Sequence, residues 1–145
     1  MFVLGLFHSR AMGEIVKFVH HGASSITPKI LRGVHKKLPF LKLEFAEIND
    51  PKFPHLVDQL EFLADAVEDF AEGVYKDLPY VAFSEAAFAL IYAHKKFEVI
   101  PDLLPDIGRA DDSSVVRAVL IQNERVFEKY AETQGFNWKK ITSKP

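Results

Sequence analysis

The chain contains no cysteine. This excludes disulfide cross-links, thiolate metal sites and cysteine nucleophiles as explanations of its structure or activity. A chain without cysteine also suits a reducing compartment. We therefore expect a cytoplasmic location, either free in solution or at the periphery of a membrane.

A long apolar run is missing as well. The longest one covers residues 79–93, but Ser84 and Glu85 interrupt it, and it is shorter than the roughly 20 apolar residues that span a bilayer. We therefore expect no transmembrane segment. With 145 residues and 48% hydrophobic content, the chain can bury one sizeable core. This predicts a single domain over residues 1–145.

The usual signatures of catalysis are not found. The sequence has no glycine-rich phosphate loop, no Gly-x-Gly-x-x-Gly, no Gly-x-Ser-x-Gly and no His-Glu-x-x-His motif. It has no helix-turn-helix pattern and a net charge of −2, so we expect no nucleic-acid partner. These patterns do not indicate an enzyme, and we expect no cofactor.

Helical periodicity is abundant. Apolar residues recur at intervals of three and four over residues 9–21, 53–75 and 112–134, whereas residues 79–93 are apolar nearly all round. The first kind of pattern is typical of amphipathic helices, and the second is typical of a helix covered on most sides. We predict an all-α fold: a single compact bundle of four to five helices around an apolar central helix at about residues 79–96.

Proline and glycine mark the predicted boundaries of these helices. Thr27-Pro28 is expected to be an N-cap followed by the first residue of a short helix. Residues 38–54 contain three prolines and are predicted to form an irregular connector. Gly22 and Gly135 are expected to end the first and last helices. The chain then divides into basic N-terminal helices with the connector (1–52), a helical core (53–133) and a C-terminal tail (134–145).

The nearly balanced net charge hides a strong asymmetry. Residues 1–42 carry seven Lys or Arg and one Glu, whereas residues 43–77 carry two Lys and ten Asp or Glu. The basic segment can pack beside the acidic one within the fold, or it can contact an anionic partner such as a lipid surface. The candidate contact residues are Lys29, Arg32, Lys36, Lys37 and Lys42.

A second concentration of charge lies in residues 97–112, which hold two prolines, one glycine and five carboxylates. The carboxylates can each cap a helix end, where they would satisfy free backbone N–H groups. Alternatively, they can converge on a hard divalent cation such as Ca²⁺ or Mg²⁺, which takes several oxygen ligands. Both alternatives stay open. The candidate metal ligands are Glu98, Asp102, Asp106, Asp111 and Asp112.

The same stretch carries a family resemblance. Tyr75-Lys76-Asp77-Leu78-Pro79 and Ala89-Leu90-Ile91-Tyr92 come first, followed in order by Ile100, Pro101, Asp102, Pro105, Gly108, Asp111 and Asp112. This order resembles the family called domain of unknown function 1232, the YkvA-like proteins, over residues 75–112. Lys96, Glu98 and Asp106 depart from the family pattern, which usually has a proline, an aspartate and an apolar residue there. The resemblance implies a helical fold and brings no biochemical activity with it.

The leading hypothesis is a non-enzymatic helical module that acts by contact. Its partner would be another protein, a second copy of the chain, or an anionic membrane surface. The competing hypothesis is a divalent-cation-binding protein or metal-dependent hydrolase that uses the carboxylates of residues 98–112.

Overall fold

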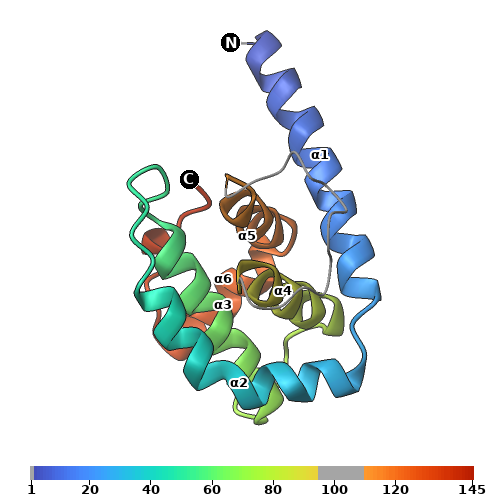
Figure 1. Cartoon of the computed structure of the whole chain (residues 1–145), viewed down its shortest axis with the longest axis vertical. Helices are drawn as coiled ribbons and strands as arrows, with labels where there is room; N and C mark the ends of the chain where they lie inside the picture. The colour runs from blue at the N-terminus through green and yellow to red at the C-terminus, as the bar shows by residue number, and fades with distance from the viewer. Residues whose placement is uncertain (1, 95–109) are drawn as a thin grey trace.

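In the computed structural model, the backbone is described for residues 2–94 and 110–145, and the side chains for residues 13–94 and 112–145. Over these residues the protein is all-helical, as predicted, and the helices pack against one another (Figure 1). The helices are α1 (Phe2–Ser24), α2 (Pro28–Ala46), α3 (Leu56–Ala71), α4 (Tyr80–Ala93), α5 (Ala110–Gln122) and α6 (Glu124–Gln134), followed by a 3₁₀ turn at Trp138–Lys140.

Helix α4 is the centre of the bundle. It contacts α1, α2, α3 and α5, and its side chains are buried on nearly every side, including the polar Ser84 and Glu85. The continuous apolar character of this segment therefore identified the central helix correctly. Among the described residues, no helix is both long and apolar enough to cross a membrane.

Helix α1 packs against α4 and α5, while its N-terminal half extends beyond the other helices (Figure 1). The prediction that Gly22 ends this helix is wrong, because the helix continues to Ser24. Gly22 instead lets α1 approach α4. A Cβ atom built on Gly22 would lie 2.1 Å from Cε1 of Phe88, which is far inside van der Waals contact.

Helix α2 is much longer than predicted. Thr27 caps it as expected, since its Oγ1 accepts a hydrogen bond from the Ile30 backbone N–H at 3.2 Å. The prediction of a connector over residues 38–54 is wrong for residues 38–46, because the helix continues through Pro39. A proline inside a helix normally costs about 3 kcal/mol, and here it is tolerated because one apolar row continues on both sides of it. The buried row consists of Leu31, Val34, Leu38, Leu41 and Phe45.

The predicted last helix is divided in two at Asn123. Its Nδ2 donates to Val119 O at 2.9 Å and to Glu85 Oε1 at 2.8 Å, so the residue is held by both α5 and the central helix. Gly135 ends α6 with a left-handed φ of 80°, as predicted. The sequence predicts a core face of Val116, Val119, Leu120, Asn123, Phe127 and Tyr130, and all of these are buried except Asn123, which is partly exposed.

The C-terminal tail is docked on α3. Phe62 is buried, and its ring contacts the rings of Phe136 and Trp138 at centroid distances of 5.7 and 5.8 Å. The buried Gln59 donates through Nε2 to Thr142 O at 2.6 Å and to Lys144 O at 2.8 Å. These contacts hold the end of the chain against α3.

Candidate functional site

Helix α2 has two faces of different chemistry. Opposite its buried apolar row, a row of exposed residues runs along the helix at intervals of three and four, so its members lie on one side. Phe40 and Leu43, in the second half of this row, are 75% and 67% exposed. We call this set the outer row of α2; it consists of Lys29, Arg32, Lys36, Phe40 and Leu43.

The sequence identified only the cationic half of the outer row. The sequence does not single out Phe40 and Leu43, because the three prolines of residues 38–54 favour a connector there over a helix. The signal that could have found them is the apolar spacing itself. Leu38, Leu41 and Phe45 continue the three-and-four pattern past the proline, and a continuing helix turns Phe40 and Leu43 outward.

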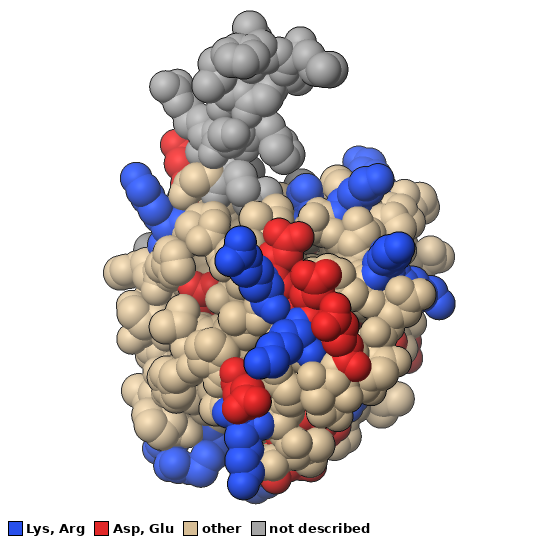
Figure 2. All heavy atoms as spheres, turned by 180° about the vertical axis from the view of Figure 1, so that it is seen from behind, with Lys and Arg blue, Asp and Glu red and all other residues tan. Residues whose placement is uncertain are grey.

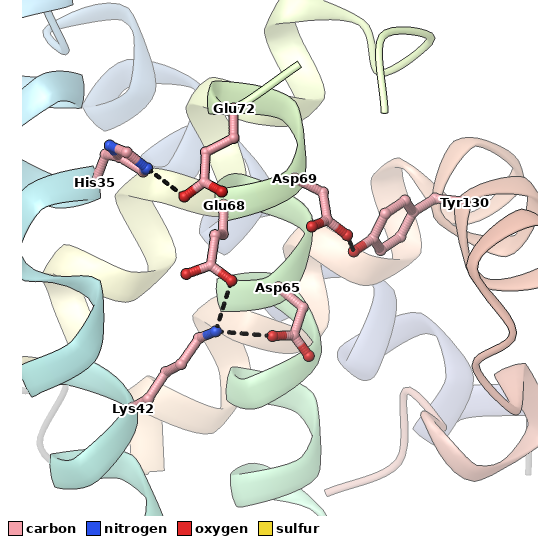
Figure 3. Close-up of polar contacts among 7 residues, drawn as sticks. All are labelled: His35, Lys42, Asp65, Glu68, Asp69, Glu72 and Tyr130. Carbon is pink, nitrogen blue, oxygen red and sulfur yellow. Dashed lines mark hydrogen bonds and ion pairs between the residues drawn. The ribbon is translucent and has the colours of Figure 1, made fainter. Parts of the chain in front are cut away.

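The two remaining predicted contact residues lie beside the outer row. Lys37 is exposed on its flank. Lys42 points toward α3, where its Nζ lies 3.0 Å from both Asp65 Oδ1 and Glu68 Oε1 (Figure 3). Burial lowers the pKa of Lys42, but its contacts with these carboxylates outweigh burial and raise the pKa overall. Lys42 therefore belongs to a partly buried contact between α2 and α3 and is already engaged there.

The acidic face of α3 is used for packing against its neighbours. Glu72 Oε2 lies 2.8 Å from His35 Nε2 of α2, in line with the Lys42 contacts (Figure 3). On the other side, Asp69 Oδ2 accepts a hydrogen bond of 2.6 Å from the hydroxyl of Tyr130 on α6. Burial and this hydrogen bond raise the pKa of the fully buried Tyr130 far above its usual value. Part of the acidic charge of residues 43–77 is therefore engaged in contacts within the fold.

The face of the molecule seen from behind does not present one sign of charge. Seen from behind, the molecule shows acidic side chains in a row with basic side chains on both sides (Figure 2). Such mixed charge is typical of an ordinary solvated surface.

A buried polar cluster connects the central helix to α1. Glu85 is only 1% exposed. Its Oε1 accepts a hydrogen bond from Asn123. Its Oε2 lies 2.5 Å from His20 Nδ1, a contact that does not have hydrogen-bond geometry. His20 is half-exposed at the outer end of this contact. The sequence marked Glu85 as an interruption of the apolar run, but its partners are distant in the chain and could not be identified locally. The cluster links three helices.

Most of the predicted acidic site lies outside the described residues. This applies to Glu98, Asp102 and Asp106, to the motif residues Ile100, Pro101, Pro105 and Gly108, and to the side chain of Asp111. Asp111 and Asp112 fall within the first turn of α5, which begins at Ala110, so they follow the start of the helix. The carboxylate of Asp112, in this first turn, interacts favourably with the helix dipole.

Asp112 lines a cleft of about 490 Å³ between the end of α2, the connector that follows it, and the end of α4. Three more acidic residues, Glu44, Glu47 and Asp50, line the same cleft, and Glu44 contacts His94 Nδ1. Within the described ranges, no three His, Asp or Glu residues are placed to hold a metal ion together. The Ca²⁺ or Mg²⁺ site therefore stays a prediction.

No known protein family matches the chain, and neither a curated protein nor a solved structure does. The resemblance to the domain of unknown function 1232 family accordingly stays a prediction that depends on residues 75–112 alone.

Proposed function

We propose that this protein is a non-enzymatic helical interaction module that contacts its partner through the outer row of α2. The observation that carries this proposal is the exposure of Phe40 and Leu43 on the same side of α2 as three exposed cations, of which Lys36 is one helical turn before Phe40. Large apolar side chains that lie together on a surface and are bordered by polar groups are typical of contact sites. The row offers both an apolar and an electrostatic component of binding.

The charges of the outer row support the same proposal. No ion pair among residues 13–94 and 112–145 involves Lys29, Arg32 or Lys36. By contrast, Lys42 and His35 on the inner flank of the helix pair with carboxylates of α3. Helix α2 therefore uses one set of basic groups to hold the bundle together and presents another set outward.

Several polar side chains of the bundle join its helices to one another. Asp65, Glu68 and Glu72 join α3 to α2, and Asp69 joins α3 to α6. Glu85 joins α4 to α1 and to the junction of α5 and α6. These roles are structural, which supports a binding module over a catalytic one.

Site-specific photo-crosslinking tests the proposal. We expect p-benzoylphenylalanine at position 40 to form adducts in cells that express the chain, and mass spectrometry would identify their chemical class. The same group at position 81 is the control, because Val81 is 59% exposed but lies on α4. Combining the label with Lys29→Gln, Arg32→Gln and Lys36→Gln should abolish the adducts. Equal adducts from positions 40 and 81, or none from position 40, would refute the proposal.

A further inference from the structure

We infer that the partner of the outer row is the surface of an anionic lipid bilayer. This inference rests on the proposed function and specifies the partner for it. It is drawn from the arrangement of charge and apolar area along α2, from the absence of carboxylates in its first four turns, and from the position of the helix on the outside of the bundle (Figure 1).

The outer row offers two kinds of group to a partner surface. From Lys29 to Leu43 it follows about 21 Å of helix, given a rise of about 1.5 Å per residue, and the helix bends along this length, which contains Pro39 (Figure 1). Its first half is cationic and its second half is apolar. A helix lying in the plane of a bilayer can place ammonium and guanidinium groups at the phosphates while apolar side chains enter the acyl boundary.

The charge of α2 is complementary to such a surface. From Pro28 through Leu43 the helix contains no Asp or Glu, while it contains five Lys or Arg. The first carboxylate, Glu44, contacts His94. An anionic bilayer attracts each nearby Lys or Arg by about 1 kcal/mol, which corresponds to about a fivefold gain in partitioning per charge.

The exposed apolar pair distinguishes a bilayer from a nucleic-acid duplex. Phosphates of a duplex would satisfy Lys29, Arg32 and Lys36 but would leave Phe40 and Leu43 in water. A bilayer can receive both groups at once, because its charged headgroups lie directly above its apolar interior. A protein with an acidic and apolar groove is the other occupant to test.

Binding to vesicles is the test. We expect the full chain to sediment with phosphatidylcholine vesicles that contain about 30% phosphatidylserine at low ionic strength, and not with vesicles of phosphatidylcholine alone, because the attraction to anionic lipid is electrostatic. The triple variant Lys29→Gln, Arg32→Gln, Lys36→Gln should partition about 100-fold more weakly. The double variant Phe40→Ser, Leu43→Ser should partition to the anionic vesicles about tenfold more weakly or worse, since it removes the apolar side chains that enter the bilayer.

Two control variants separate the outer row from general effects. The first control is the triple variant Arg125→Gln, Lys129→Gln, Lys139→Gln, whose positions are exposed on α6 and the 3₁₀ turn. Like the outer-row triple variant, it lowers the net charge from −2 to −5. Val81→Ser removes an exposed apolar side chain elsewhere. Neither should change partitioning by more than about twofold. Circular dichroism would confirm that each variant keeps its helices.

Three results of the vesicle experiments would overturn the inference. It fails if anionic vesicles do not bind the chain, if the control triple variant loses as much affinity as the outer-row variant, or if Phe40→Ser, Leu43→Ser binds like the parent. Absent vesicle binding combined with protein adducts from position 40 would overturn the lipid inference and leave the proposed function standing. Absent adducts of any class would count against the proposed function itself.

Discussion

Replacing Gly22 with alanine should destabilise the fold by about 3 kcal/mol, although alanine normally stabilises a helix. The added Cβ would lie 2.1, 2.4 and 2.7 Å from Cε1, Cζ and Cδ1 of Phe88. The ring cannot move away freely, because Phe88 is buried and its ring packs edge-on against Phe18 at a centroid distance of 5.6 Å. Either α1 must shift away from α4 or the aromatic contacts must rearrange. Urea unfolding followed by circular dichroism measures the change.

Gly33→Ala is the matched control for this prediction. Gly33 also lies inside a helix, but apart from the adjacent backbone of that helix no atom lies within 4 Å of a Cβ built there. The same substitution should therefore leave stability unchanged or raise it by about 0.5–1 kcal/mol, because alanine loses less backbone entropy than glycine. A neutral or stabilising Gly22→Ala would show that α1 and α4 do not approach each other this closely.

Tyr130→Phe should cost about 2 kcal/mol near pH 8. The substitution removes only the hydroxyl that donates to Asp69 Oδ2 at 2.6 Å and leaves the ring among its neighbours. A hydrogen bond to a charged acceptor is worth more than a neutral one. Tyr75→Phe is the control, since that ring is buried beside Tyr130 at a centroid distance of 5.0 Å but no described hydrogen bond involves its hydroxyl. Tyr75→Phe should lower the free energy of unfolding by clearly less than Tyr130→Phe does.

The effect of Tyr130→Phe should also depend on pH. The folded state raises the pKa of Tyr130, so above about pH 10 the unfolded chain loses a proton that the folded chain retains. The stability due to this group is complete below pH 10 and falls as the pH rises further. The difference between parent and Tyr130→Phe should therefore shrink by about 1.4 kcal/mol between pH 8 and pH 11. A constant difference would contradict the buried position of the hydroxyl.

Local patterns in the sequence predicted much of the architecture. The buried row of α3, the all-round apolar character of α4 and the Thr27 cap depend on residues close together in the chain. Each is a case where local preference and the final packing agree. The same is true of Gly135, whose left-handed φ is the conformation that glycine adopts most readily.

The failures have a common physical cause. Pro39 suggested an end to α2, and only the burial of Leu38, Leu41 and Phe45 against other helices offsets its cost. The junction of α5 and α6 is held to the central helix by the bond from Asn123 to Glu85, which are 38 residues apart. Propensity within a short window does not contain such tertiary contributions.

The candidate site was predictable in part. The cations of the outer row were identified from charge alone, and Lys42 was grouped with them because charge does not say which lysine faces α3. Phe40 and Leu43 became visible only once the helix was seen to continue past Pro39. For the acidic stretch 98–112, most residues lie outside the described part of the chain, and the divalent-cation site stays a prediction.

The central claim is that the outer row of α2 contacts the surface of an anionic bilayer, and tryptophan fluorescence tests it most directly. The label is Phe40→Trp in a Trp138→Phe background, because Trp138 is the one native tryptophan. In the free protein its emission should be that of an exposed indole and be quenched readily by acrylamide. On anionic vesicles the emission should shift to the blue and be protected from acrylamide, while neutral vesicles leave it unchanged. An indole already shielded in the free protein, or one equally quenched with and without anionic vesicles, would contradict the account.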